Sequence, residues 1–282
     1  MTFRQLSKIT NDLLKSELKV DLNGISLKND ITTQLLIKKK KIIARIINKE
    51  SIIFCGGMLI KNFYNEKFPE ITVKVNHKDG QKIKKNSVLI TLIGSANLIL
   101  TTERTILNFL QHLCSISTET RNYVSRIKKF KTKLLDTRKT TTGLRKLEKY
   151  ATQTGGAVNH RLGLYDDILI KDNHIKIIGG VDEMIAILKK KKIKNYKVEC
   201  DNISQVKKCI KAGAKYILLD NMKPYQVKKI INSSPKKSLI FEVSGGINLA
   251  NISEYAKFGA HFISTSKITL CSKSVDISLD LI

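Results

Sequence analysis

The chain has 282 residues, 42% of them hydrophobic, so it can bury a substantial core and has room for two domains. No run of 18 apolar residues occurs, which argues against a membrane span, and the five cysteines show no C-x-x-C spacing, which favours reduced thiols in a cytoplasm. The formal net charge of +27 favours either nucleic-acid binding or a solvated, lysine-rich surface. The lysines are spread along the whole chain and aromatic residues are scarce, so nucleic acid is the less favoured partner.

The sequence pattern of residues 1–112 predicts an N-terminal α/β domain. The expected elements in chain order are helices at 5–18 and 30–48, strands at 71–76 and 87–94 around a turn at 77–86, and a long amphipathic helix from Thr101 to Lys128. The last helix of this domain is expected to lead into the next domain.

From about residue 130 onward, short apolar runs alternate with helical patterns. The expected strands are 133–136, 168–172, 196–200, 216–221, 239–246 and 261–266, and the helices between them are 144–154, 181–190, 203–212, 224–232 and 248–258. Such alternation gives a parallel sheet that curls in one direction, and a barrel is its natural closure. We assign the barrel to residues 113–270 and expect 271–282 to return to the N-terminal domain.

The ends of these strands carry charges or glycines. In parallel α/β barrels the chemistry lies at the carboxyl ends of the strands. The strand ends here are Arg138 and Lys139, Lys171 and Asp172, Glu199, Asp220, "SGG" at 244–246, and "STS" at 264–266. Loops are often polar for no functional reason, but a ring of cations, two acids and a glycine turn favours a functional mouth.

The cations of this mouth occur in "DTRKT", "VNHR" and "LIKDNH". Arginine binds carboxylate or phosphate through two parallel hydrogen bonds, whereas lysine acts as a mobile point charge. Together these cations predict a small substrate with several negative charges. His160, beside Arg161, is either a core histidine or a substrate contact, and its place at the mouth favours a contact.

Glu199 and Asp220 end neighbouring strands, and two carboxylates facing a cationic pocket suit Mg²⁺, which keeps waters and bridges substrate phosphates. The alternative is a salt bridge from each acid to a lysine. The glycine pair at 244–246 and the hydroxyls at 264–266 suit a phosphate group bound by backbone N–H groups. A dianion pocket, a Mg²⁺ pair and a phosphate site together fit phosphoribosyl transfer from a pyrophosphate donor.

Several longer motifs match one family. They are "TTERTILNFLQ" (101–111), "DTRKTTTGLRKLEKYA" (136–151), "GGAVNHRLGLYDDILIKDNH" (155–174), "ILLDNM" (217–222), "EVSGGI" (242–247) and "SVDISLDL" (274–281). With them the chain resembles the quinolinate phosphoribosyltransferases, or carboxylating nicotinate-nucleotide pyrophosphorylases, over nearly its whole length. The resemblance implies an incomplete, about seven-stranded parallel α/β barrel with an N-terminal α/β sandwich domain.

The reaction that the resemblance implies joins quinolinate to phosphoribosyl pyrophosphate. Its products are nicotinate mononucleotide, pyrophosphate and CO₂, and it is a Mg²⁺-dependent step of NAD biosynthesis. The alternatives are a related barrel enzyme that uses another anionic heterocycle, and a basic nucleic-acid-binding protein.

The resemblance also implies a role for each site residue. Arg138, His160, Arg161 and Lys171 would hold the quinolinate carboxylates, and Arg104 would reach the partner's site in a homodimer or a higher oligomer. The substrate-binding set on the donor side comprises Thr137, Lys139, Lys171, Glu199, Asp220, Ser244, Gly245, Gly246, Ser264, Thr265 and Ser266. Within it, Lys139 and Lys171 would meet donor phosphates, and Glu199 and Asp220 would hold Mg²⁺, partly through water, and the ribose hydroxyls. These last four residues are the expected catalytic group.

The chain departs from the family pattern at a few positions. Thr142 stands where proline is usual, Ala157 where glycine is usual, Cys114 and Ser115 where Ser-Gly is usual, and Leu270 and Cys271 where His-Ser is usual. None of these changes removes a proposed site residue, but they bear on the tightness of the pocket and on stability.

Overall fold

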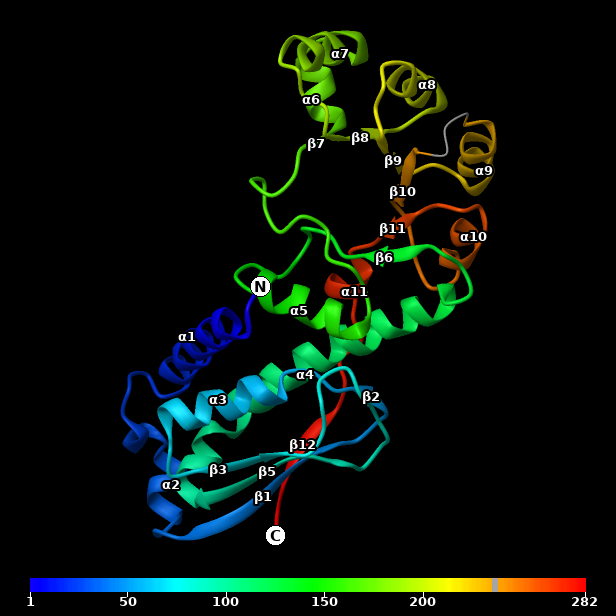
Figure 1. Cartoon of the computed structure of the whole chain (residues 1–282). Coiled ribbons are helices and arrows are strands. Elements are labelled where there is room, and N and C mark those ends of the chain that lie inside the picture. Colours follow the sequence, from blue (N-terminus) through cyan, green and yellow to red (C-terminus); the bar gives the residue numbers. More distant parts are fainter. Residues whose placement is uncertain (235–237) are drawn as a thin grey trace. The chain divides into compact units, whose positions relative to one another are not determined.

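The structure, a computed structural model, describes residues 1–234 and 238–282, and its contacts divide the chain into two units (Figure 1). The first unit contains residues 1–121, 146–156 and 272–282, and the second contains residues 122–145 and 157–271. The sequence-based boundaries at 112 and 270 stay a prediction.

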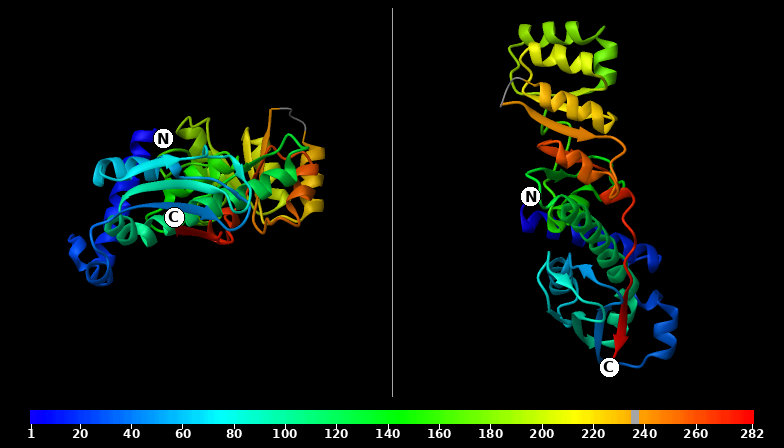
Figure 2. Two further views of the ribbon diagram at one scale, coloured as in Figure 1. Left: turned by 90° about the horizontal axis from the view of Figure 1, so that it is seen from below. Right: turned by 90° about the vertical axis from the view of Figure 1, so that its right-hand side faces the viewer.

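The first unit combines helices with a small antiparallel sheet. Its elements are α1 (Phe3–Asp21), η1 (Leu27–Asn29), α2 (Ile31–Leu36), β1 (Lys41–Asn48), β2 (Ile52–Ile53), α3 (Gly57–Lys67), β3 (Thr72–Val75), β4 (Lys82–Ile83), β5 (Val88–Ser95), most of α4 (Ala96–Ile127), α5 (Arg145–Gly155) and β12 (Ile277–Leu281). The order of its main sheet is β12-β1-β5-β3, and β2 pairs with β4. The C-terminal strand β12 lies antiparallel beside β1, as Figure 2 shows.

The predicted helix at 30–48 is wrong in its second half, because β1 occupies Lys41–Asn48. The isoleucines of "KIIARIIN" fit both a helical and an alternating pattern. In the structure the side chains of Ala44, Ile46 and Asn48 are buried on one face, which is the period of a strand. The pairing of β1 with β5 on one side and β12 on the other favours the strand.

The second unit alternates strands and helices, as predicted. Its elements are β6 (Lys133–Leu135), β7 (Leu169–Ile170), α6 (Asp172–Ile177), α7 (Val181–Lys190), β8 (Lys197–Cys200), α8 (Ile203–Lys211), β9 (Tyr216–Asp220), α9 (Pro224–Ser233), β10 (Ile240–Ser244), α10 (Ile252–Lys257), β11 (Phe262–Ser264) and α11 (Lys267–Leu270). The strand pairs are all parallel and their order is β6-β11-β10-β9-β8-β7. A lone parallel bridge adds Val158 beside Leu135 of β6.

The sheet of the second unit, as far as the described residues show it, does not close, and this confirms the prediction of an incomplete barrel. None of the described helices is long and apolar enough to span a membrane.

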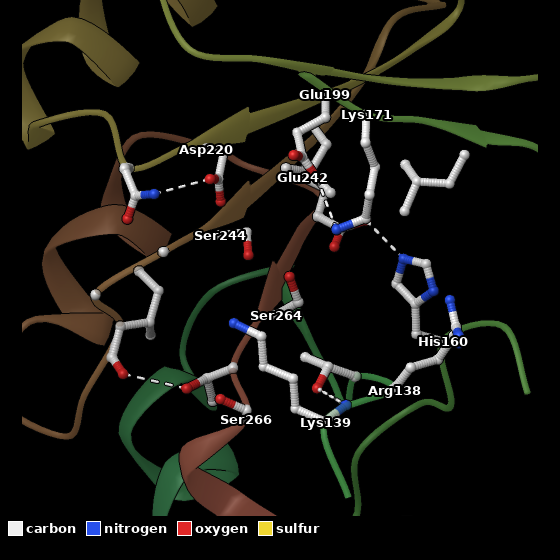
Figure 3. A pocket seen from close by; sticks show the side chains of 18 of the residues that line it. Arg138, Lys139, His160, Lys171, Glu199, Asp220, Glu242, Ser244, Ser264 and Ser266 are labelled. Atoms are coloured by element: carbon white, nitrogen blue, oxygen red, sulfur yellow. Dashed lines mark hydrogen bonds and ion pairs between the residues drawn. The ribbon is translucent and has the colours of Figure 1, made fainter. Parts of the chain in front are cut away.

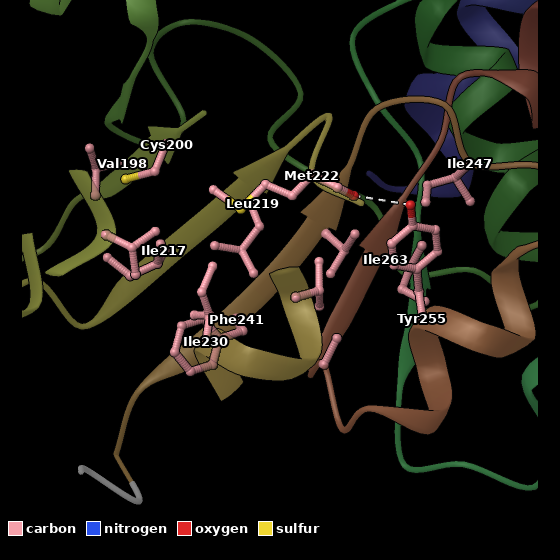
Figure 4. Packing of buried hydrophobic residues seen from close by; sticks show 14 of the residues in the cluster. Val198, Cys200, Ile217, Leu219, Met222, Ile230, Phe241, Ile247, Tyr255 and Ile263 are labelled. Carbon is pink, nitrogen blue, oxygen red and sulfur yellow. Dashed lines mark hydrogen bonds between the residues drawn. The ribbon is translucent and has the colours of Figure 1, made fainter. Parts of the chain in front are cut away.

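The two faces of this sheet differ sharply in chemistry. Val198, Ile217, Leu219 and Phe241 point to the helices and join one buried apolar cluster (Figure 4). Because side chains alternate along a strand, the intervening residues point to the opposite face. On β8, β9, β10 and β11 those residues include Glu199, Asp220, Glu242, Ser244 and Ser264. The alternation therefore places a polar layer inside the curl of the sheet.

Candidate active site

A pocket of about 330 Å³ opens at the carboxyl ends of the parallel strands (Figure 3). The residues predicted from the sequence that line it are Thr137, Arg138, Lys139, His160, Arg161, Lys171, Glu199, Asp220, Ser244, Gly245, Gly246, Ser264, Thr265 and Ser266. The remaining predicted residue, Arg104, lies exposed on α4 in the first unit and is not among the lining residues. Seven loops or strand ends that are separate in the sequence thus meet at one site.

Six further residues line the pocket that sequence reasoning did not select. They are Leu169, Leu218, Asn221, Glu242, Ile247 and Lys267. Of these, Glu242 carried a usable signal, since it is an acid within the apolar run "LIFEVSGG". Asn221 directly follows Asp220 and donates from Nδ2 to the Asp220 carboxylate at 2.8 Å.

The loop after β6 is held in place by its own polar groups. The Lys139 N–H donates to Thr137 Oγ1 at 3.0 Å, and the Thr269 hydroxyl donates to the Lys139 carbonyl at 2.9 Å. The Arg138 Nε is buried and has no hydrogen-bond partner among the described residues. A buried guanidinium N–H without an acceptor is unfavourable, so the Arg138 side chain is held beside the pocket at a cost in free energy.

A second arginine lies close enough to feel the charge of Arg138. The Arg161 side chain is buried and donates from Nη1 to the Asp167 carbonyl at 2.8 Å. Burial lowers the pKa of Arg161, and the neighbouring Arg138 cation lowers it further. Two arginines held together against their repulsion suit a ligand with more than one negative charge.

Two carboxylates face the cations from the ends of β8 and β9. Glu199 is 9% exposed, and its Oε2 lies 3.5 Å from the Lys171 Nζ. Burial raises the pKa of Glu199 above its ordinary value, and Asp220 raises it further, although Lys171 opposes both effects. Burial also raises the pKa of Asp220, and Asp201 adds to this shift. The pair is therefore short of positive charge even with Lys171 beside it.

The glycine turn after β10 is fitted closely against Asn221. Gly245 has φ +85°, and a Cβ there would clash with the Asn221 Oδ1. Only glycine adopts this conformation freely and leaves the space that Asn221 needs. The adjacent loop is tied by the Thr265 hydroxyl, which donates to the Ile247 carbonyl at 3.1 Å. These contacts shape a small polar recess with hydroxyl groups at Ser244, Ser264 and Ser266.

Two family models together match most of the chain. The quinolinate phosphoribosyl transferase N-terminal domain matches residues 30–114, and the C-terminal domain of the same name matches residues 116–280.

Individual proteins match as well. A probable carboxylating nicotinate-nucleotide pyrophosphorylase of Bacillus subtilis (strain 168) is 35% identical over 100% of this chain and 95% of its own length. The carboxylating nicotinate-nucleotide pyrophosphorylase of Mycobacterium leprae (strain TN) is 33% identical over 89% of this chain and 91% of its own.

Solved structures of the same kind share the fold. The nicotinate-nucleotide pyrophosphorylase from Francisella tularensis superposes with a TM-score of 0.89 at 36% identity, covering 98% of this chain and 97% of that chain. The protein of that name from Ehrlichia chaffeensis has a TM-score of 0.89 at 35% identity and covers 100% of this chain and 99% of that chain.

Proposed function

This chain belongs to the quinolinate phosphoribosyl transferase family, and from that premise we propose that it transfers the phosphoribosyl group of phosphoribosyl pyrophosphate to quinolinate. Pyrophosphate and CO₂ leave, and nicotinate mononucleotide is formed for NAD biosynthesis. The resemblance inferred from the motifs is thus confirmed as family membership.

The observation that carries this proposal is the state of the two arginines. The Arg138 Nε is a buried donor without an acceptor, beside an Arg161 whose pKa is lowered by burial and by Arg138. Quinolinate offers two neighbouring carboxylates, which are planar acceptors suited to guanidinium groups. Binding this dianion beside the two guanidinium groups would relieve the repulsion between the arginines.

The lining residues can perform the chemistry by position and charge alone. Lys139 and Lys171 face the pocket and suit the phosphates of the donor. As pyrophosphate departs, the ribose carbon becomes positively charged, and the pyridine nitrogen of the bound acceptor attacks it. The alkylated ring then stabilises the carbanion left by the departing CO₂, and this carbon takes a proton from water to give nicotinate mononucleotide. No step needs a covalent nucleophile or a general base from the protein.

We further propose that Glu199 and Asp220 hold Mg²⁺. The two oxygen donors fit the ion, because both carboxylates have a raised pKa and line one pocket at the ends of neighbouring strands. Mg²⁺ bound there would neutralise charge on the pyrophosphate leaving group.

The test is release of CO₂ and pyrophosphate by the purified protein with Mg²⁺, phosphoribosyl pyrophosphate and quinolinate, with nicotinate as the control acceptor. We expect equal amounts of CO₂ and pyrophosphate when quinolinate is the acceptor, and neither product when nicotinate is the acceptor. Arg138→Ala should lower kcat/KM for quinolinate by about 30-fold or more, because its partner charges on the ligand are left unpaired. Arg45→Ala, at an exposed position of β1, is the matched control and should not change kcat/KM. A folded wild-type protein that releases neither product refutes the proposal.

We propose that the active unit is a homodimer in which Arg104 completes the partner's pocket. In support, Arg104 is exposed on α4 rather than engaged in the core of its unit. Neither Arg104→Ala nor Arg138→Ala protein should be active alone. In a mixed dimer, the Arg104→Ala subunit keeps Arg138 and receives Arg104 from its partner, so one of the two sites is intact. About half of randomly formed dimers are mixed, so about one quarter of all sites should regain activity. If Arg104 acts within its own chain, mixing restores no activity.

A cytoplasmic location of the protein remains a prediction.

A further inference from the structure

The orientation of His160 differs from that of a residue open to the substrate. Its Nδ1 accepts a hydrogen bond from the Arg161 N–H at 2.7 Å, and its Nε2 lies 3.5 Å from the Glu242 Oε2. A ring nitrogen that accepts a hydrogen bond carries no proton, so the proton of this imidazole lies on Nε2 and points to Glu242. Both ring nitrogens of His160 are therefore engaged by the protein itself.

Glu242 is a fixed acceptor beneath the pocket. Its side chain is fully buried on β10, and its Oε2 also accepts the Tyr216 hydroxyl at 2.6 Å. The Tyr216 ring is stacked on Phe262, with ring centroids 6.1 Å apart, so this donor has little freedom.

A second buried carboxylate holds the same segment from the other side. Asp136, at the end of β6, is fully buried and accepts the His160 backbone N–H at 2.8 Å. It also accepts the Asn159 side-chain amide at 2.6 Å. The segment 159–161 is thus fastened at two points, to β6 through Asp136 and to β10 through Glu242.

We propose that Glu242 is a positioning residue that acts through His160. The chain of contacts runs from the Tyr216 hydroxyl to Glu242, then to the neutral imidazole of His160, and from there to the Arg161 peptide N–H. It fixes the backbone from which the Arg161 side chain reaches the pocket. His160 is then a neutral residue that supports the backbone at Arg161, and not a cation that binds a substrate carboxylate. This inference rests on the proposed function, because Arg161 is expected to hold quinolinate.

The protonation state can be measured on the wild-type protein without any turnover. In ¹⁵N-edited NMR at pH 7, the His160 ring should show one protonated nitrogen, Nε2, and one unprotonated nitrogen, Nδ1, with His160→Gln used for assignment. Two protonated ring nitrogens would overturn the proposal. This measurement decides the point even if the proposed reaction fails in the assay.

Steady-state kinetics distinguish a His160 that supports the backbone from a His160 that binds quinolinate directly. Glutamine can donate from its amide to Glu242 but cannot carry a charge, so His160→Gln should raise KM for quinolinate only about threefold, against about tenfold or more for His160→Ala. Glu242→Gln should shift the NMR signals of His160 and lower kcat/KM for quinolinate by about tenfold, with KM for phosphoribosyl pyrophosphate nearly unchanged. Equal effects of glutamine and alanine at His160 would contradict the proposal.

Two further variants guard against misfolding. Tyr216→Phe removes one hydrogen bond to Glu242 and keeps the carboxylate, so it should give the same selective loss for quinolinate in a milder form if Glu242→Gln does not fold. Glu254→Gln, at an exposed position of α10, is the matched control and should change neither KM. A loss shared equally by both substrates in Tyr216→Phe would point to general instability and would overturn the positioning role.

Discussion

Two buried or half-buried acids of the first unit, Glu148 and Asp79, and two acids of the second unit, Glu199 and Asp220, lie in opposite electrostatic surroundings. In the first unit, Glu148 is fully buried with its Oε1 3.0 Å from the His112 Nε2. Asp79 accepts the backbone N–H groups of Gly56 at 2.8 Å and Gly57 at 3.2 Å, where α3 begins, and also the Tyr150 hydroxyl. These acids have nearby donors that offset the loss of water. They stabilise the fold.

In the second unit, Glu199 and Asp220 remain short of positive charge. The pKa of each is raised, so each folded carboxyl binds its proton more tightly than the unfolded one. Their contribution to stability is therefore present below the ordinary carboxyl pKa and is lost as the pH rises through the raised folded pKa. At neutral pH the pair works against the fold. The difference between the two pairs indicates that Glu148 and Asp79 serve the structure, whereas Glu199 and Asp220 serve a ligand.

The largest expected effect comes from removing charge from the second set. Asp220→Asn should lower kcat by about 10²- to 10³-fold, because a preorganised charge beside the reacting phosphates is lost. It should also leave the melting temperature unchanged or slightly higher, since an unfavourable carboxylate has gone. Steady-state kinetics and thermal unfolding of the same preparation check both parts. A variant that loses activity and stability together would mean that Asp220 serves the fold, as the acids of the first unit do.

The pH dependence of Mg²⁺ binding sharpens the same contrast. As the pH falls through the raised pKa values of Glu199 and Asp220, protons compete with the ion for the carboxylates. The apparent Mg²⁺ dissociation constant should then rise by about tenfold per pH unit for each carboxylate that must lose a proton. Titration of Mg²⁺ followed by calorimetry between pH 4 and pH 7, as an order-of-magnitude window around carboxyl pKa values, measures this slope. A flat profile would place the ion elsewhere.

The opposite pattern is expected for Asp79 in the first unit. Asp79→Ala should lower the free energy of unfolding by about 1–3 kcal/mol, because the N–H groups of Gly56 and Gly57 lose their acceptor. The kinetic constants should not change, since Asp79 is not a lining residue of the pocket. Asp280→Asn is the control: this acid pairs with Lys49 at 3.4 Å on the surface, and its loss should cost less than about 1 kcal/mol. A drop in kcat for Asp79→Ala would contradict the assignment of Asp79 to the acids that serve only the fold.

The sequence predicted the second unit well, because its signals are local. Each of the six strands coincides with an apolar run, and parallel strands bring their carboxyl ends to one edge. The first unit was harder. β1 lies between β5 and the distant strand β12, so its conformation is decided by partners that no local pattern reveals. Asn48 also hides the alternation of buried and exposed positions in β1, because it is a polar residue at a buried position. Its side-chain amide donates there to the carbonyls of Glu50 and Lys84.

The site shows the same division between local and distant information. Charges at strand ends identified the cations and the two acids that line the pocket. Glu242 lies inside its strand and not at the strand end, so the charges at strand ends do not select it, and its importance depends on Tyr216 and His160 from other segments. The protonation state of His160 depends likewise on the Arg161 N–H, which only the folded loop directs at Nδ1.

The smallest effect is expected at Ser115, where glycine is usual in the family pattern. Its hydroxyl donates to the Gln111 carbonyl at 2.6 Å and accepts the Val275 N–H at 3.0 Å, which ties the C-terminal segment to α4 within the first unit. Ser115→Ala should cost about 1 kcal/mol, because the Val275 N–H loses its acceptor. Hydrogen exchange at the Val275 amide should speed up by a similar free energy, whereas Ser274→Ala, at an exposed position, should leave it unchanged. Unaltered exchange in Ser115→Ala would mean that β12 alone holds this segment, and that the serine contributes no more to the first unit than the glycine would.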